Sequence, residues 1–370
     1  MKITTHAERF TNPLYLESGR ILEPYELKYE TYGTLNEDKS NVIVVCHALT
    51  GSHHAAGLYE GDRKAGWWDE MIGDGKPIDT EAFFVICVNV IGSCFGSTGP
   101  MSPKYPSSDL YRMKFPVITI SDMVKAQRIL FDRLGIHRAH AIIGGSMGGM
   151  QALCFAIEHP NFASKHIILA STYATGPWAI AFNKVAREAL VQDPDFKDGF
   201  YDPVEIKESG LSGLATGRMC GYISYLSPDS MCKKFGRNYV QTDGLYELFG
   251  KFEIERYLDY NGLNFVNWFD PLSFLYITKA INIFDSTRNY DSLEDSLSRI
   301  KSEITLISFS NDLLFLPREM EKIHKTMGNI GKENLSKYIK IDSDYGHDAF
   351  LVEIDKFSHH VTNALKEETR

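Results

Sequence analysis

The segment AIIGGSMGGMQAL contains a serine between glycines in the pattern G-x-S-x-G, with Gly144, Ser146 and Gly148 at the fixed positions. A short apolar run precedes the serine, and an apolar-periodic stretch that stops at Pro160 follows it. This order of strand, sharp turn and helix is typical of a nucleophile elbow, which exposes a serine for attack on an acyl carbon. The glycines suit such a turn because neighbouring backbones approach closely there. The alternatives are a glycine-rich turn that only packs tightly and a phosphate-binding loop, but neither G-x-G-x-x-G spacing nor a Walker lysine is present.

A serine hydroxyl needs a base to remove its proton, so a histidine must be found. In the α/β-hydrolase fold, where this elbow occurs, the chain order is serine, acid, histidine. His347, in SDYGHDAFL, falls in the loop between the last predicted strand and the last predicted helix, where the sheet topology brings a loop over the nucleophile. We therefore predict that His347 is the base, the alternative being a surface histidine in a turn. The other histidines after the serine lie on predicted helices or on the wrong segments: His159, His166, His324, His359 and His360.

The acid of the triad should follow the penultimate strand. The segment EITLISFSNDLLFLP ends that strand near Ser310 and places Asp312 just beyond it. A carboxylate there can hold the imidazole tautomer and stabilise the imidazolium. Asp342 and Asp344 compete for this role, but they lie on the strand end and loop of the histidine itself. We predict Asp312.

The oxyanion hole takes one N–H from the residue after the nucleophile, here Met147. The second N–H comes from the loop after an earlier strand, and HALTG after VIVVC fits that position, with Leu49 as the predicted donor. Three nearby histidines could suggest a metal ion: His47, His53 and His54. No further ligand stands at a recognisable spacing, so we predict no metal site.

The elements that must position these residues alternate between strands and helices. NVIVVCHA and AFFVICVNVIG are continuous apolar runs, as expected for strands buried on both faces of a parallel sheet. From about Tyr173 to Ser298 the short strand-like runs give way to aromatic and helix-forming stretches, after which the strand pattern resumes. We predict an α/β-hydrolase fold, a mostly parallel doubly wound sheet with an inserted helical lid. The predicted core is 1–172 and 299–370, and the predicted lid is 173–298.

The composition sets limits on partners and location. The chain has 370 residues, 44% of them hydrophobic and 24% charged, and a formal net charge of −9. This negative balance argues against nucleic acid or an acidic membrane as a partner. The first residues lack an apolar signal segment, and no apolar run approaches the roughly 18 to 20 residues that span a bilayer. Because the six cysteines lie mostly in apolar stretches, they indicate free thiols, and we predict a cytoplasmic protein.

The amino-acid sequence resembles the homoserine O-acetyltransferase family over nearly the whole chain. The matching segments include HALTGSHHAAG, GWWDEMIGDGKPIDT, VNVIGSCFGSTGP, GGSMGGMQAL, WAIAFNKVAREAL, GRMCGYISYLS, FDPLSFLYITKAINIFD and GHDAFL. The resemblance implies a ping-pong acyl transfer, in which Ser146 accepts an acetyl group from acetyl-CoA and passes it to the hydroxyl of L-homoserine, in L-methionine biosynthesis. Acetyl-CoA is then a substrate, and no cofactor is expected.

The resemblance also implies which residues hold the amino acid. The matching positions are Arg218, which can grip a carboxylate with two hydrogen bonds, and Asp348, which can receive an ammonium group. Tyr225 is a weaker candidate for the pocket. Their alternatives are a solvated helix face or lid ion pair for the arginine, and a first-turn acid favoured by the helix dipole for the aspartate. The family usually forms homodimers, and we expect one here through the helical lid.

Some positions depart from the family pattern, such as Asn311 before the acid, and they leave the substrates open. Relatives use succinyl-CoA or transfer to L-serine. A carboxylesterase or thioesterase would use the same triad with water as acceptor, and a non-catalytic binding protein could share the fold. No nucleotide motif identifies the residues that bind CoA.

Overall fold

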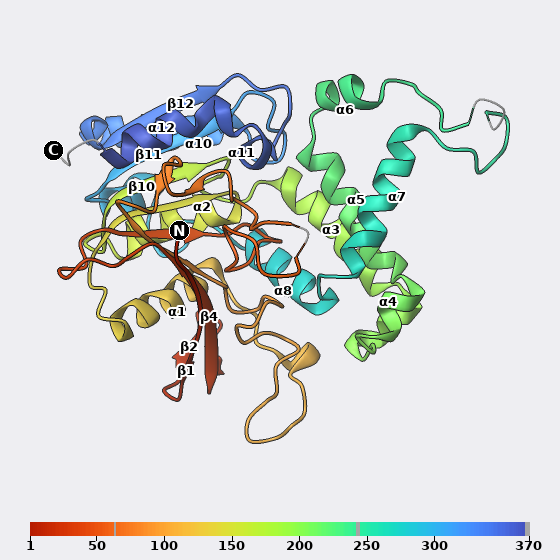
Figure 1. The fold of residues 1–370 in the computed structure, drawn as a ribbon, viewed down its shortest axis with the longest axis horizontal. Coiled ribbons are helices and arrows are strands. Elements are labelled where there is room, and N and C mark those ends of the chain that lie inside the picture. Colours follow the sequence, from red (N-terminus) through yellow and green to blue (C-terminus); the bar gives the residue numbers. More distant parts are fainter. Residues whose placement is uncertain (63, 242–244, 367–370) are drawn as a thin grey trace.

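The computed structural model describes residues 1–62, 64–241 and 245–366. Its centre is an eight-stranded sheet in the order β1-β4-β8-β5-β9-β10-β11-β12 (Figure 1). The strands are β1 (Ile3–Phe10), β4 (Tyr25–Tyr32), β5 (Val42–Cys46), β8 (Phe84–Val88), β9 (Ala139–Gly145), β10 (Ala163–Leu169), β11 (Glu303–Phe309) and β12 (Ser336–Ile341). The β1–β4 and β4–β8 pairs are antiparallel, and all other pairs in this sheet are parallel. Two small sheets pair β2 (Leu14–Tyr15) with β3 (Ile21–Leu22) and β6 (Ile72–Gly73) with β7 (Ile78–Asp79).

The apolar runs form the central strands because both faces of the sheet are covered. All five residues of β5 are buried, and successive side chains enter two different core clusters. Helices α1 (Ile120–Arg133), α2 (Met147–Glu158) and α10 (Pro317–Asn329) contribute to one cluster. Helix α12 (Ile354–Lys366) contributes to the other. The doubly wound sheet predicted from the sequence is therefore confirmed.

Two elements differ from the sequence-based expectation. Strand β1 was not predicted, because its residues ITTHAERF are mainly polar and it lies at the edge of the sheet. The spacing of Phe350, Ile354, Phe357, Val361 and Leu365 by three and four residues predicts one continuous final helix. The helix is instead divided at Glu353 into α11 (Ala349–Val352) and α12. The apolar spacing of three and four residues crosses this break, so the pattern alone did not indicate it.

Between β10 and β11 the described residues contain helices and no named strand: α3 (Pro177–Val191), η2 (Pro194–Gly199), α4 (Glu205–Ser209), α5 (Ser212–Tyr225), α6 (Pro228–Phe235), α7 (Glu253–Val266), α8 (Pro271–Asn282) and α9 (Leu293–Ser298). Helices α3 to α7 gather at one side of the sheet, and α8 runs back toward it (Figure 1). Helix α5 lies between α3 and α7, and glycines permit this close packing: a Cβ on Gly213 would lie 2.3 Å from the Ala189 carbonyl oxygen. The predicted limits of core and lid stay predictions.

Two further short 3-10 helices are η1 (Arg112–Lys114), before α1, and η4 (Glu333–Leu335), before β12. Among the described residues no helix has both the length and the apolar character needed to traverse a membrane. All six cysteines are unpaired, and of these Cys232 is exposed.

Candidate active site

Ser146 occupies the turn between β9 and α2 in a strained backbone conformation. Its φ of 57° and ψ of −123° are unusual for a residue with a side chain. Its N–H donates to the Leu169 carbonyl at 3.0 Å, and its carbonyl accepts from the Ser171 hydroxyl at 2.9 Å. Such strain persists where the surroundings hold the residue, and it is concentrated at functional sites.

The glycines on either side of the serine are required by close approach. A Cβ on Gly144 would lie 2.4 Å from the carbonyl carbon of Gly148, so strand and helix could not meet. A Cβ on Gly148 would lie 2.1 Å from the carbonyl oxygen of Cys46 at the end of β5. The pattern G-x-S-x-G therefore places the first turn of α2 directly against the loop that follows β5.

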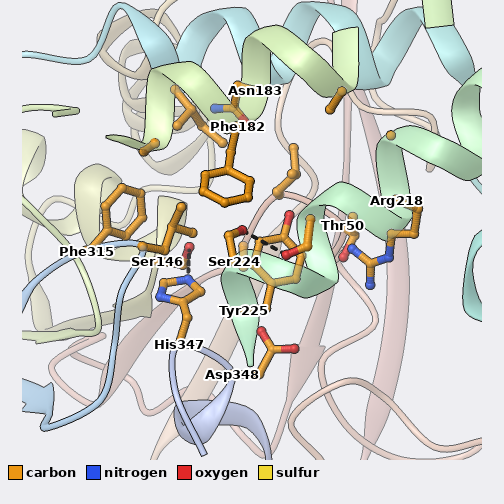
Figure 2. Close-up of a pocket in the computed structure, with 18 of the residues that line it drawn as sticks. Thr50, Ser146, Phe182, Asn183, Arg218, Ser224, Tyr225, Phe315, His347 and Asp348 are labelled. Atoms are coloured by element: carbon orange, nitrogen blue, oxygen red, sulfur yellow. Dashed lines mark hydrogen bonds between the residues drawn. The ribbon is translucent and has the colours of Figure 1, made fainter. Parts of the chain in front are cut away.

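The structure brings Ser146, His347 and Asp312 into one hydrogen-bonded row. The serine hydroxyl lies 2.8 Å from His347 Nε2 (Figure 2). His347 Nδ1 lies 2.8 Å from Asp312 Oδ2. The residues come from the turn after β9, the loop after β12 and the turn after β11. All three are buried. Because a carboxylate only accepts, Nδ1 carries the proton and Nε2 is free to accept from the serine.

Asp312 is fixed in orientation by its second oxygen. Asp312 Oδ1 accepts the backbone N–H groups of Leu314 and Phe315, each at 2.9 Å. The other oxygen is thereby left for His347. The competing carboxylates lie elsewhere: Asp342 accepts from the Ser310 hydroxyl, and Asp344 pairs with Lys233 at the surface.

The surroundings of His347 favour its protonated form. Burial lowers the pKa of this imidazole, but the charge of Asp312, the hydrogen bond to it and the charge of Asp348 outweigh burial, so the pKa is raised above its usual 6.5. The rings of Phe315 and Phe350 pack edge-on against the imidazole. The arrangement can accept a proton from the serine and stabilise the resulting positive charge.

The two predicted oxyanion-hole donors are free for a ligand. Leu49 lies in the loop after β5 and lines the same cavity as Ser146, and Met147 is the first residue of α2. The backbone N–H groups of Leu49 and Met147 donate to no atom among the residues that the structure describes. Free N–H groups beside a nucleophile can stabilise an oxyanion.

Arg218 and Asp348 both line the cavity, and within the described chain neither forms an ion pair. The Arg218 guanidinium lies over the rings of Tyr222 and Phe265, at 4.6 Å and 4.8 Å from their centroids. Tyr225 lies beside both groups in Figure 2, and its ring centroid is 5.6 Å from the Arg218 guanidinium carbon. Burial raises the pKa of the Asp348 carboxyl, although His347 and Arg218 oppose this effect. One cationic and one anionic group are thus held apart in one pocket.

The cavity lies between the sheet and the helical insert, with a volume of about 80 Å³. Helix α3 contributes Phe182 and Asn183, and the loop after β5 contributes Thr50 (Figure 2). Sequence reasoning did not identify these three residues, since no local signal distinguishes them from ordinary positions of an amphipathic helix or a loop.

The fold and the hydrogen-bonded serine define a class of protein. Residues 41–354 match the family model described as alpha/beta hydrolase fold, so the chain belongs to that family. It is 67% identical over 365 residues to a homoserine O-acetyltransferase of Sulfurimonas autotrophica, with 99% of each chain covered. It is 60% identical to the homoserine O-acetyltransferase of Nautilia profundicola, with 100% of each covered. Within the fold family, the chain is therefore a member of the homoserine O-acetyltransferases, a family of acyltransferases.

Solved structures agree with this assignment. The X-ray structure of homoserine O-acetyltransferase from Bacillus anthracis is 28% identical, with a TM-score of 0.92 over 100% of this chain and 99% of the other. The crystal structure of esterase E22 is 27% identical, with a TM-score of 0.88 over 99% and 100% of the chains. An acetyltransferase and an esterase share this architecture, so the fold by itself does not choose between an alcohol and water as acyl acceptor.

Proposed function

We propose that this chain transfers the acetyl group of acetyl-CoA to the side-chain hydroxyl of L-homoserine through an acetyl-Ser146 intermediate. The observation that carries the proposal is the hydrogen-bonded row of Ser146, His347 and Asp312 beside a cavity lined by Arg218 and Asp348, which form no ion pair among the described residues. The row supplies an activated nucleophile, and the two charged groups suit the carboxylate and ammonium of an amino acid.

In the first half-reaction Ser146 Oγ attacks the thioester carbonyl while its proton passes to His347 Nε2. The oxygen of the tetrahedral intermediate accepts hydrogen bonds from the N–H groups of Leu49 and Met147. When the intermediate collapses, the carbon–sulfur bond breaks and His347 returns the proton to the leaving thiolate. Free CoA and acetyl-Ser146 result. This step needs no cofactor, since acetyl-CoA is itself the acyl donor.

In the second half-reaction Arg218 holds the homoserine carboxylate and Asp348 holds its ammonium group. The homoserine hydroxyl gives its proton to His347 Nε2 as its oxygen attacks the acetyl carbonyl. Collapse breaks the ester bond to Ser146, and His347 returns the proton to the serine oxygen. Positioning of the acceptor hydroxyl raises its effective concentration over that of water, which favours transfer over hydrolysis.

A substrate matrix tests the proposal: acetyl-CoA and succinyl-CoA, each with L-homoserine, L-serine and no acceptor. We expect CoA release from acetyl-CoA to depend on homoserine and to yield O-acetylhomoserine. Equal rates with and without homoserine would instead identify a thioesterase, and faster turnover of succinyl-CoA or L-serine would identify a sister activity.

A homodimer formed through the helical insert is also part of the proposal. The segment between α6 and α7 exposes large apolar side chains, with Tyr246, Leu248 and Phe249 at 96%, 88% and 86% exposure. Large apolar side chains exposed close together in the chain are candidates for an interface with a second copy. Sedimentation velocity at micromolar concentration should give a dimer, and replacing Leu248 and Phe249 by serine should yield monomers. A wild-type protein that sediments only as a monomer contradicts this part.

We further propose that the enzyme acts in the cytoplasm in L-methionine biosynthesis. The expected phenotype of a deletion strain is a requirement for methionine that O-acetylhomoserine relieves. Cell fractionation should recover the protein with cytoplasmic markers, and recovery with the membranes would contradict the location.

A further inference from the structure

The loop that supplies Leu49 contacts a buried histidine side chain, that of His47, which directly follows β5. Its side chain is 0% exposed and does not line the cavity. His47 Nε2 accepts the backbone N–H of Val90 at 3.1 Å, and His47 Nδ1 lies 2.8 Å from the carbonyl oxygen of Ala48. The mechanism proposed above leaves this histidine unused.

The two partners determine which ring nitrogen carries the proton. A backbone N–H can only donate, so Nε2 must be unprotonated to accept from Val90. A carbonyl oxygen can only accept, so the remaining proton lies on Nδ1 and is donated to Ala48. Burial lowers the pKa of His47 to about 4, so the ring is neutral at ordinary pH and this single tautomer persists.

The bond to Ala48 has a consequence for the next residue because a peptide unit is planar and trans. The carbonyl of Ala48 and the N–H of Leu49 belong to the same unit and point in opposite directions. The carbonyl is directed at the buried imidazole and also accepts the Gly51 N–H at 3.0 Å. The Leu49 N–H must then point to the opposite side, and Leu49 lines the cavity that contains Ser146.

We infer that His47 is a positioning residue for acyl transfer: its Nδ1–H holds the Ala48–Leu49 peptide in the orientation that directs the Leu49 N–H into the oxyanion hole. A flipped peptide would present the Ala48 carbonyl oxygen to the oxyanion, where it would repel the developing charge. The inference rests on the proposed function, because it assigns a role in the acylation of Ser146.

A second contact joins this loop to the other donor. The carbonyl oxygen of His47 accepts from Gln151 Nε2 at 3.1 Å, and Gln151 is buried on α2, the helix that begins at Met147. Gln151 Oε1 in turn accepts from Gln127 on α1 at 2.8 Å. His47 therefore fixes the loop through its side chain and ties it to α2 through its backbone.

Two substitutions separate the proposed bond from general packing. In His47→Asn the amide group lies where Nδ1 was and can donate to Ala48, but the acceptor for Val90 is lost. In His47→Gln the amide reaches the place of Nε2 and can accept from Val90, but the donor to Ala48 is lost. Each variant removes one bond of the same buried ring, so their losses of thermal stability should be similar.

The assay is the burst of p-nitrophenol released on acetylation of Ser146 by p-nitrophenyl acetate, together with kcat and KM for acetyl-CoA. Loss of one oxyanion donor lowers kcat by about 10²- to 10³-fold, which is the upper limit for His47→Gln. We expect His47→Asn to retain at least about ten times the acetylation rate of His47→Gln, with KM for acetyl-CoA changed much less than kcat. Equal acetylation rates in the two folded variants would overturn the inference.

If either variant fails to fold, a measurement on the unaltered protein tests the predicted tautomer of His47. In protein labelled with ¹⁵N-histidine, long-range ¹H–¹⁵N spectra should show His47 protonated at Nδ1 and unprotonated at Nε2. An Nε2-protonated ring would overturn the inference. The burst needs no homoserine, so a wild-type protein that is acetylated but fails to transfer to homoserine would refute the proposed acceptor and leave the His47 comparison interpretable.

Discussion

Replacing Asp312 by asparagine should abolish most of the activity while leaving the shape of the site intact. Asp312 Oδ1 accepts two backbone N–H groups, and only an oxygen can do so. In Asp312→Asn the amide oxygen must therefore stay at that position, and the NH₂ group must face His347 Nδ1. Since NH₂ only donates, Nδ1 has to become an acceptor, and the proton moves to Nε2.

A proton on Nε2 is incompatible with catalysis because that nitrogen must accept the proton of Ser146. The magnitude known for an aspartate-to-asparagine change in such a triad is about 10⁴ in kcat. That loss corresponds to about 5.5 kcal/mol of transition-state stabilisation. We expect a loss of this order in both the p-nitrophenyl acetate burst and the homoserine-dependent release of CoA, with KM values changed far less.

Asp342→Asn is the matched control, because it makes the same chemical change at one of the competing carboxylates. Asp342 accepts from the Ser310 hydroxyl at the surface, so kcat should stay within about twofold of the unaltered enzyme. Far-ultraviolet circular dichroism and melting temperature establish that both variants fold. A loss below about tenfold in folded Asp312→Asn, or an equal loss in Asp342→Asn, would refute the argument from the tautomer.

Ser146→Ala should show no burst and a fall in transfer of at least about 10⁴-fold, measured as CoA release, and retention of homoserine-dependent transfer would contradict an acyl-serine intermediate. Arg218→Lys should raise KM for homoserine by about tenfold or more, because a lysine cannot form two parallel hydrogen bonds to the carboxylate. An unchanged KM would show that Arg218 does not bind the acceptor. The acetylation rate should fall as pH decreases through a pKa above 6.5, since His347 must be neutral to act as the base and its pKa is raised. Asp348→Asn should shift this acidic limb of the pH–rate profile to lower pH. An acidic limb below pH 6.5 in the unaltered enzyme would contradict the assignment of His347 as the base. Burial lowers the pKa of His166 to about 3 and that of His47 to about 4, so below pH 6.5 the unfolded chain binds more protons than the folded protein. The free energy of unfolding should therefore decrease from pH 6.5 toward pH 4. Urea denaturation that gives equal free energies of unfolding at pH 7 and pH 5 would contradict this.

The esterase neighbour shows why the acceptor site needs direct measurement. Esterase E22 and this chain share one architecture over nearly their whole lengths, yet this chain belongs to the homoserine O-acetyltransferases. In this chain Arg218 and Asp348 line the cavity between sheet and insert, so substitutions there test the choice of acceptor directly.

The sequence alone led to Ser146, His347 and Asp312 because each depends on a local pattern. A serine between glycines at a strand-to-helix turn is recognisable within about ten residues, and continuous apolar runs mark the buried strands that the acid and the histidine follow. Because these strands are parallel, the carboxyl ends of β9, β11 and β12 lie on the same side of the sheet. In this way two hydrogen bonds join residues 35 and 201 positions apart in the chain.

What only the tertiary structure decided is how the insert and the loops complete the pocket. The apolar spacing of α3 indicates a buried face, but not that Phe182 and Asn183 line the cavity of Ser146, because periodicity does not identify what a helix face packs against. Arg218 and Asp348 entered through family resemblance, and the structure added the aromatic rings that hold the guanidinium. The peptide orientation at Leu49 depends on a ring that touches both the loop after β5 and Val90 after β8. Contacts between separate elements carry no local sequence signal, and so they became visible only once the chain was folded.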